Sequence, residues 1–565
     1  MRGLLAALGG AVCLFAASSS ALAADPPLTV PIASCAAHSS PAATVTAGLP
    51  STYPGSDAAG TMRMFLGIPY ALPPTGANRW SPPVTTPGKL CWDGDKITNT
   101  FGKLCAQGPT LQPWHSEDCL VLNVFTRPTG NVSGQPVMVF IHGGGLQNGS
   151  GSFQLNPYPL IQQGVVVVTI NYRLGPLGFL AHSALKHKTG NFGILDQQAA
   201  LKWVKSNIRA FGGDPANVTI FGGSAGGLSV LVHLVSPLSD GLFHKAIIQS
   251  GSFYHQAASL SSAQQKGANF ASLLGCGTAA CLRAKPLANI VSAHASNPNT
   301  LGQSVNLLTQ DNTNLTDTLQ NLLQTGNFKK VPTIVGSTQH ETRFHIAGNQ
   351  AFGTGGGCNF VSNIDASNYG TKIQSTGNGA FAGQIQGAYP AFSVRSANEM
   401  LAQQWTDSHY ACRTLRVNRW MALKAGKNYA YEFSDANAPP TMWPQFKLSD
   451  GSKFSFGAYH GGEQPFLFRM GSMNACGGNP PPDNKIPALS TAQRQLSAAM
   501  VTYWTTFAKT GNPNPVGSEL PVWPEFQATT AGKIISFAGR VPKLITASKF
   551  DTDHKCTSFW DGKVP

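Results

Sequence analysis

The strongest chemical signal in the sequence is a serine held between glycines, Ser224, in a Gly-x-Ser-x-Gly pentapeptide at 222–226. A β-branched run at 218–221 precedes the pentapeptide, and apolar residues at helical spacing follow it. This order of strand, tight turn and helix is that of a nucleophile elbow, which exposes the serine hydroxyl at the edge of a sheet. An ordinary glycine-rich turn could share the pentapeptide, so the assignment depends on a base, an acid and oxyanion donors elsewhere.

An acid and a base follow Ser224 in the chain order that such an elbow uses, which is serine, acid, histidine. Glu341 comes just past an apolar strand at 331–336, where it can turn into the sheet edge. His460 stands in a glycine-flanked loop, free to point at Ser224. Glu463 is the nearest rival for the acid, but its position after the histidine does not fit the order.

Three consecutive glycines after His142 end another apolar run, at 136–141. Residues without a Cβ let backbone N–H groups approach a substrate oxygen, and the N–H of Ala225 lies beside the serine. Gly144, Gly145 and Ala225 are therefore the predicted oxyanion hole. The alternative is a flexible glycine loop.

A metal site is not predicted. His340, Glu341 and His345 resemble a zinc motif, but the two histidines are five residues apart, whereas a helix presents ligands four apart. We expect neither metal nor other cofactor.

The elements that must position these residues alternate between strands and helices. A helix is expected over 195–209, ending at a glycine pair, and apolar strands are expected at 65–72, 116–125, 136–141, 165–172, 218–223, 245–250, 331–336 and 429–433. This alternation predicts an α/β fold with a mostly parallel central sheet. Because no repeat or low-complexity linker divides the chain, residues 24–565 are predicted to form one catalytic domain with large helical and loop insertions.

The first 23 residues resemble a secretory signal peptide, with a basic start, a short apolar stretch and small residues ending at Ala23. No later segment is long enough to span a membrane. Residues 25–60 are expected to be irregular with edge strands. These features predict a secreted or periplasmic protein.

Charge and cysteine content indicate which binding partners and which cellular compartment to expect. Only 11% of residues are charged, and the net charge of +14 comes from scattered Lys and Arg without a basic stripe, so no nucleic-acid partner is expected. Loss of the signal removes Cys13 and leaves ten of the eleven cysteines, an even number suited to an oxidising compartment. By spacing, Cys276 and Cys281 could close a small loop, and Cys105 and Cys119 a larger one. The pairing of the others is left open: Cys35, Cys91, Cys358, Cys412, Cys476 and Cys556.

Taken in order, the motifs resemble type-B carboxylesterases of the carboxylesterase and cholinesterase family, within the α/β-hydrolase fold. The resemblance covers about residues 65–524. It rests on the elbow, the His142 glycine run, and the segments at 67–71, 117–120, 171–173, 190–193, 195–197, 211–215 and 507–513.

The resemblance implies roles and pairings for individual residues. Ser224 is the implied nucleophile, His460 the general base and then acid, and Glu341 the residue that orients the histidine. Disulfides Cys105–Cys119 and Cys276–Cys281 are also implied. Arg173, Asp196 and Glu117 match positions that are structural in the family and are expected to be ion-paired.

The sequence departs from the family pattern near these residues. Gly223 stands where the family usually has Glu, and Leu146 where it usually has Phe. His340 and Thr342 flank Glu341, where the family favours Asp and Gly.

The predicted function is hydrolysis of a small-molecule carboxylic ester through an acyl-enzyme. Activity should fall on acidification, since a protonated imidazole accepts no proton. The short loop between Cys105 and Cys119 favours an open esterase over an interfacial lipase, and its Trp114 is equally a packing residue or a ligand contact. A lipase, a specialised polyester, toxin or tannin esterase, and a non-catalytic cholinesterase-like binding protein are the alternatives. The sequence carries no signal for the natural ester or the oligomeric state.

Overall fold

The computed structural model describes most of the chain between residues 29 and 563. The described residues are 29–35, 44–47, 62–127, 133–152, 155–253, 256–297, 308–353, 360–361, 364, 367–374, 378–390, 396–441, 447–448, 454–470 and 488–563. The predicted signal peptide at 1–23, together with Cys358 and Cys476, lies outside these ranges.

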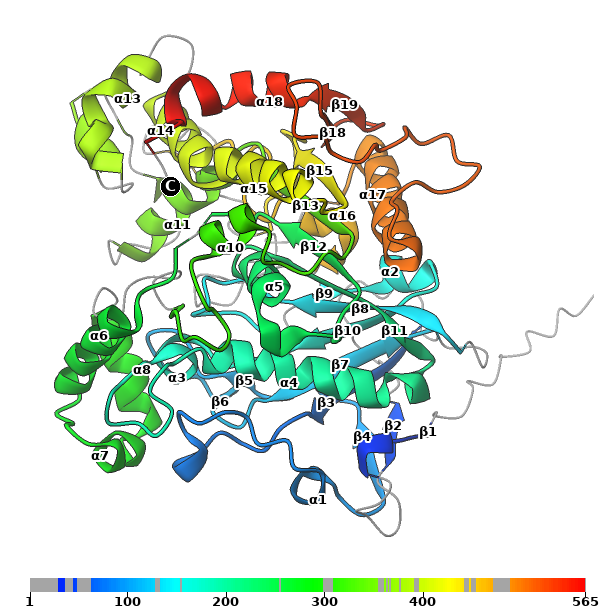
Figure 1. Cartoon of the computed structure of the whole chain (residues 1–565), viewed down its shortest axis with the longest axis vertical. Helices are drawn as coiled ribbons and strands as arrows, with labels where there is room; N and C mark the ends of the chain where they lie inside the picture. The colour runs from blue at the N-terminus through cyan, green and yellow to red at the C-terminus, as the bar shows by residue number, and fades with distance from the viewer. Residues whose placement is uncertain are drawn as a thin grey trace, which may run out of the picture.

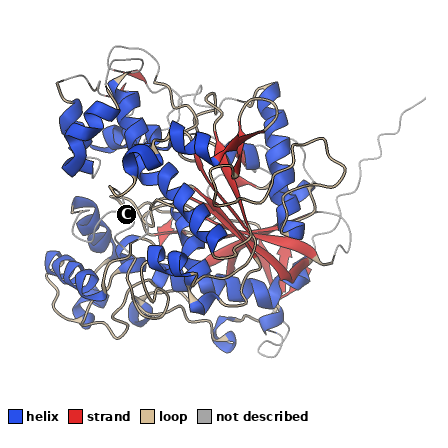
Figure 2. Ribbon diagram, turned by 45° about the horizontal axis from the view of Figure 1, so that its top comes forward, coloured by secondary structure: helices blue, strands red, loops and turns tan. Residues whose placement is uncertain are grey.

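A twisted sheet of ten strands forms the centre of the protein (Figures 1 and 2). Its spatial order is β19-β18-β15-β13-β12-β11-β8-β10-β7-β3. In that order the strands are Lys543–Thr546, Lys533–Phe537, Asn428–Phe433, Thr333–Thr338, Lys245–Gln249, Gly213–Gly223, Gln135–Ile141, Val166–Ile170, Val121–Thr126 and Arg63–Pro69.

The seven strands from β18 to β10 run parallel, and the strands at the two edges are antiparallel. This arrangement confirms the mostly parallel sheet predicted from the sequence. Parallel strands covered on both faces need apolar side chains on both faces. In β8, Val139 and Ile141 pack into one core cluster, whereas Met138 and Phe140 pack into another.

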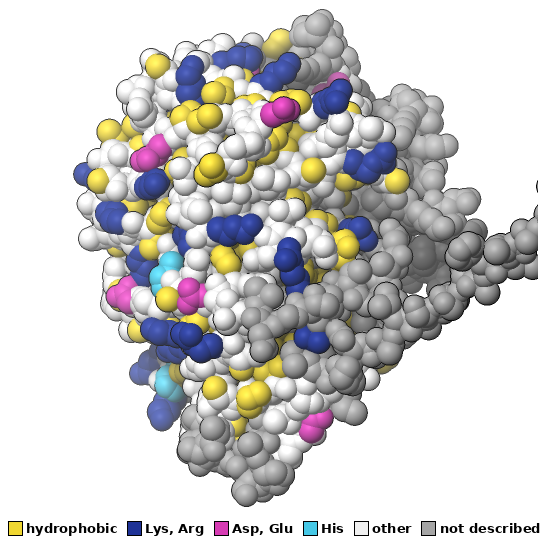
Figure 3. Space-filling view, turned by 90° about the vertical axis from the view of Figure 1, so that its right-hand side faces the viewer, with side chains coloured by type: hydrophobic (Ala, Val, Ile, Leu, Met, Phe, Trp, Pro, Cys, Tyr) yellow, Lys and Arg dark blue, Asp and Glu magenta, His cyan; other side chains and the backbone are white. Residues whose placement is uncertain are grey.

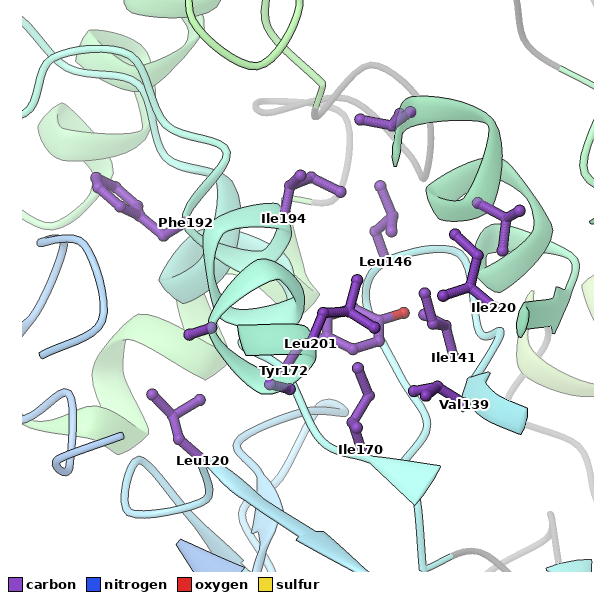
Figure 4. Close-up of a cluster of buried hydrophobic side chains, with 14 of the residues drawn as sticks. Leu120, Val139, Ile141, Leu146, Ile170, Tyr172, Phe192, Ile194, Leu201 and Ile220 are labelled. Carbon is purple, nitrogen blue, oxygen red and sulfur yellow. The ribbon is translucent and has the colours of Figure 1, made fainter. Parts of the chain in front are cut away.

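Helices cover both faces of the sheet. One face carries α4 (Phe192–Asn207) and α5 (Ala225–Val235), and the other carries α17 (Thr491–Thr510) with α2 (Tyr158–Gln162) and α16 (Gln464–Leu467). Figure 4 shows part of the first core, where Leu201 of α4 lies near Ile170 of β10 and Tyr172. The predicted helix at 195–209 is α4, which begins three residues earlier.

Further helices lie around this framework: α1 (Pro87–Leu90), α3 (Gly175–Phe179), α6 (Leu260–Leu273), α7 (Ala279–Ala284), α8 (Leu287–Ser296), α10 (Leu319–Thr325), α11 (Glu341–Gly353), α12 (Tyr369–Ile373), α13 (Ala382–Ala388), α14 (Ala397–Thr406), α15 (Cys412–Leu423) and α18 (Ala547–Asp553). Most of them belong to the insertions expected outside the sheet.

Short strands outside the central sheet build small accessory sheets. A three-stranded sheet joins β1 (Thr29–Pro31), β2 (Thr44–Ala47) and β4 (Asp95–Thr98). The two-stranded sheets pair β5 (Leu104–Cys105) with β6 (His115–Ser116), β9 (Leu155–Asn156) with β17 (Arg469–Met470), and β14 (Phe360–Val361) with β16 (Lys447–Leu448). The segment at 25–60 was expected to be irregular with edge strands. Its described part supplies β1 and β2 to the separate three-stranded sheet and forms a 3-10 helix at Ala33–Cys35.

Four disulfides connect described cysteines. Cys105–Cys119 and Cys276–Cys281 are the pairs implied by the family resemblance. Cys35–Cys91 and Cys412–Cys556 settle four of the cysteines whose pairing the sequence left open. Such bonds persist in oxidising compartments.

The surface agrees with the low charge content of the sequence. Figure 3 shows Lys and Arg side chains spread over one face of the molecule, with uncharged side chains between them. In the portion of the chain that the structure describes, no helix combines the length and apolar character needed to cross a bilayer.

Candidate active site

Ser224 lies at the turn between β11 and α5, as the elbow pattern predicts. Its backbone has φ 59° and ψ −127°, a conformation that residues with side chains rarely adopt. The turn is tight: a Cβ added to Gly226 would lie 2.0 Å from the carbonyl oxygen of Ile141, and one added to Gly222 would lie 2.4 Å from it. Both glycines are therefore required for β11 and α5 to pass β8 so closely.

The glycine run after β8 lies directly against the elbow. A Cβ added to Gly143 would come within 3.1 Å of the Ser224 Cβ. Among the described residues, the N–H groups of Gly144 and Gly145 donate no hydrogen bond. The N–H of Ala225, at the first position of α5, has no partner within its helix. Three backbone donors are thus available in the turns around the serine.

Glu341 and His460 form a buried pair. The Nδ1 atom of His460 lies 2.6 Å from Oε2 of Glu341, and the backbone N–H of Thr338 donates to Oε1 at 2.8 Å. The Glu341 side chain is fully buried, so these donors compensate for its lost hydration.

Two hydrogen bonds between residues 340 and 458 hold the acid segment beside the histidine loop. Glu341 follows the carboxyl end of β13, and the loop that carries His460 lies beside it. The N–H of His340 donates to the carbonyl of Ala458 at 2.9 Å, and the N–H of Ala458 donates to Nδ1 of His340 at 3.1 Å. His340, one of the departures from the family pattern, therefore links the acid segment to the histidine loop.

The same loop reaches the elbow. Gln464 is four residues past His460, and its Nε2 would lie 3.1 Å from a Cβ added to Gly223. On the other side of the elbow, the N–H of Ser224 donates to the carbonyl of Gln249 at 2.8 Å. Ser224, His460 and Glu341 consequently lie at the carboxyl edge of β11–β13, where open α/β sheets bind ligands.

The second ring nitrogen of His460 is unpaired. Nε2 is buried and has no hydrogen-bond partner among the described residues. A buried polar atom without a partner is costly, and a catalytic role is one explanation for it. With Nδ1 held by Glu341, Nε2 is the atom that can accept a proton.

Glu463 is a different kind of carboxyl. It is buried, its Oε1 is 3.5 Å from Nε2 of Gln249, and its Oε2 has no partner among the described residues. Burial, reinforced by the nearby charge of Glu341, raises the pKa of Glu463 to about 7. The hydrogen bond to His460 is made by Glu341 and not by this rival.

Aromatic rings line the environment of His460. The rings of His345, Tyr410 and Phe344 lie 5.0, 5.2 and 6.0 Å from its ring. Nε2 of His345 is 2.8 Å from the hydroxyl of Tyr410, and burial lowers the pKa of His345 well below its usual value. In the sequence, His345 stood out only as part of a zinc-like motif. Its position four residues after Glu341, near the start of α11, was the signal that it would lie near the acid.

The predicted structural ion pairs are present away from the serine. Nε of Arg173 donates to the Asp196 carboxylate at 2.7 Å, and Nε of Arg79 donates to Glu117 at 2.6 Å. Trp114 is half exposed, and its ring lies edge-on to that of His115 at 6.2 Å.

Comparison with known proteins identifies the family. The model of the carboxylesterase family matches residues 50–551. The chain is 33% identical over 543 residues to the human (Homo sapiens) cocaine esterase, an alignment that covers 89% of this chain and 88% of the relative. The chain therefore belongs to the carboxylesterase family, and it is a carboxylic ester hydrolase of the α/β-hydrolase fold.

Proposed function

We propose that the protein hydrolyses esters through an acyl-enzyme formed on Ser224. Nε2 of His460 takes the hydroxyl proton as the oxygen attacks the ester carbonyl, and the resulting imidazolium gives that proton to the leaving alcohol. Water then repeats the sequence on the acyl-enzyme and releases the acid. Glu341 holds the imidazole in the Nδ1–H tautomer and stabilises its charged form.

The N–H groups of Gly144, Gly145 and Ala225 are the proposed oxyanion donors. The observation that supports them is that these N–H groups donate to none of the described residues, while Gly143, next to Gly144, packs on Ser224. Donors fixed by backbone geometry need no reorganisation as charge develops on the substrate oxygen.

The geometry of the histidine supports the proposal most strongly. One ring nitrogen is fixed by a buried carboxylate at 2.6 Å, and the other is buried and has no hydrogen-bond partner among the described residues. This arrangement leaves Nε2 of His460 free to accept a proton, as a general base requires.

We propose small-molecule esters as the substrate class. The segment between Cys105 and Cys119 is short and paired through β5 and β6, which suits an open site better than a long lipase lid. The relative at 33% identity is named as an esterase of cocaine, which places small-molecule esters within the family. The disulfides and the N-terminal pattern support export of a single catalytic domain at 24–565.

Pre-steady-state kinetics test this proposal. With p-nitrophenyl acetate, an acyl-enzyme gives a burst of nitrophenol equal to the number of active sites, provided that deacylation is slower than acylation. We expect Ser224→Ala to lose the burst and the steady-state turnover, while Ser272→Ala, an exposed serine on α6, retains both. Full turnover by Ser224→Ala would contradict the proposal. A panel of short-chain, long-chain and aromatic esters would then define the preferred acyl group.

A further inference from the structure

The turn at 144–149 has an unusual backbone for a segment that carries the proposed oxyanion donors. Gly144, Gly145, Leu146 and Gly149 all have positive φ, at 101°, 66°, 61° and 110°. Leu146 has a side chain and still adopts the left-handed region, which is unfavourable for such a residue. A turn of this kind persists only when its surroundings hold it.

Two hydrogen bonds hold the beginning and the middle of the turn in place. The hydroxyl of Tyr172 donates to the carbonyl of His142 at 2.9 Å, and its ring stacks on the His142 ring at 4.3 Å. The carbonyl of Leu146 accepts from the N–H of Gly175 at 2.8 Å. Figure 4 shows Leu146 and Tyr172 among the buried apolar side chains of the core.

The end of the turn is held by one side chain from another part of the chain. Oε1 of Gln107 accepts from the N–H of Gly149 at 2.7 Å, and Nε2 of Gln107 donates to the carbonyl of Gly149 at 2.9 Å. Nε2 also donates to the carbonyl of Cys105 at 2.9 Å. Both N–H bonds of the Gln107 amide donate hydrogen bonds. This fixes the orientation of the amide, because a flipped side chain would point its oxygen at the carbonyl oxygens of Cys105 and Gly149.

Gly149 is packed closely on the donors. A Cβ added to Gly149 would lie 2.6 Å from the carbonyl oxygen of Gly143 and 2.4 Å from Nδ1 of His142. The carbonyl oxygen of Asn148 would lie 2.1 Å from a Cβ on Gly144. With no space between these backbones, a shift of Gly149 displaces the peptides of Gly143 and Gly144.

We propose that Gln107 is a positioning residue for the oxyanion hole, which it acts on through Gly149. This inference rests on the proposed roles of Gly144 and Gly145. Loss of an entire oxyanion donor costs about a hundred- to a thousandfold in rate, and a displacement of about 1 Å can cost roughly a hundredfold. Without Gln107 the donors would be displaced but not removed. We therefore expect a loss of about ten- to a hundredfold in kcat, with KM changed little, because the donors act mainly on the transition state.

Gln107→Met tests the inference, because methionine has nearly the same length and forms neither bond to Gly149. Rates are normalised to active sites titrated with a fluorophosphonate, so that unfolded protein does not count. The second readout is the inhibition constant of a trifluoromethyl ketone, which forms a tetrahedral adduct with the serine. We expect this constant to rise by the factor by which kcat/KM falls.

Two further variants control the experiment. Gln112→Leu changes an exposed side chain of the same disulfide loop and should leave kcat and the inhibition constant unchanged. Gln107→Glu places a second acceptor against the carbonyls of Cys105 and Gly149 and should lose at least as much as Gln107→Met.

The inference would be overturned if Gln107→Met kept the wild-type kcat and inhibition constant, or if only its KM changed. This holds provided that the wild-type enzyme reacts with the fluorophosphonate and turns over substrate. Full activity of Gln107→Glu would overturn it as well. Failure of the proposed function is a separate result, in which the wild-type protein is not labelled or Ser224→Ala remains active.

Discussion

Nδ1 of His460 and Oε2 of Glu341 lie 2.6 Å apart in a buried pair, while Glu463, three residues past the histidine, makes its hydrogen bond to Gln249. Two carboxyls close to one imidazole thus have different environments. One stabilises a positive charge on His460 by direct contact, and the other has its pKa raised to about 7 by burial. This difference determines which carboxyl should matter for turnover.

Glu341→Gln should reduce kcat by roughly a thousand- to ten-thousandfold, because an amide disfavours the correct tautomer and does not stabilise the imidazolium. Glu463→Gln should lose far less. The measurement is kcat, together with kcat/KM, for p-nitrophenyl acetate, with folding checked by circular dichroism. A larger loss in Glu463→Gln than in Glu341→Gln would show that the acid has been misassigned.

Gly143→Ala should lower kcat by about a hundredfold or more, since the new methyl group would lie 2.7 Å from the Gly223 carbonyl oxygen and 3.1 Å from the Ser224 Cβ. The matched control is Gly387→Ala in α13, where an added Cβ would meet no atom of the described residues within 4 Å. That variant should keep full activity and gain slightly in stability, by up to about 1 kcal/mol. Equal activities of the two variants would contradict the close packing of the glycine run on the nucleophile.

Gly223→Glu restores the residue that is usual in the family and should destabilise this chain, because even a Cβ at that position lies 3.1 Å from Nε2 of Gln464. Combining it with Gln464→Ala should recover part of the loss. A double-mutant cycle measured by urea denaturation gives the coupling. Strict additivity of the two changes would indicate that Gln464 does not occupy the space of the missing side chain.

A second buried histidine should control stability at alkaline pH. Nδ1 of His554 lies 2.5 Å from Asp407, and Nε2 lies 2.8 Å from Glu432. Although burial alone would lower the pKa of His554, the two carboxylates raise it to about 10. Because the folded-state pKa lies above the ordinary value of about 6.5, the stabilisation is complete below that pH and is lost as the pH rises towards 10.

His554→Gln should therefore be less stable than wild type by roughly 3–5 kcal/mol at pH 6.5, and the gap should narrow as the pH rises to 10. The free energy of unfolding is measured by urea denaturation at several pH values. Burial lowers the pKa of His187, so it titrates below this window, and the gap for His187→Gln should stay constant across it. A constant gap for His554→Gln would exclude a charged imidazole in the folded protein.

The sequence was most informative where one chemical demand restricts a short segment. The elbow needs glycine at 222 and 226, and the structure gives the steric reason, since β8 passes within contact distance of both. Buried parallel strands could also be predicted, because continuous apolar runs such as 136–141 and 245–250 are typical of strands buried on both faces.

Long-range side-chain pairings could not be predicted in the same way. Gln107 meets Gly149, His340 meets Ala458, and His554 meets Asp407 across separations that no local pattern encodes. The helix α17 was also not predicted, although Ser490 and Gln493 form a capping box at its start that could have revealed it. The pairing of Cys412 with Cys556 depends on where the C-terminal helix α18 packs, which spacing does not specify.

The identity of the nucleophile is tested most directly by covalent labelling. Purified protein is treated with a fluorophosphonate, and the labelled peptide is identified by mass spectrometry alongside residual hydrolysis of p-nitrophenyl acetate. The account predicts one adduct per molecule on Ser224, loss of hydrolysis in step with labelling, and no adduct on Ser224→Ala. Labelling of a different residue with loss of activity, or an active Ser224→Ala, would contradict it.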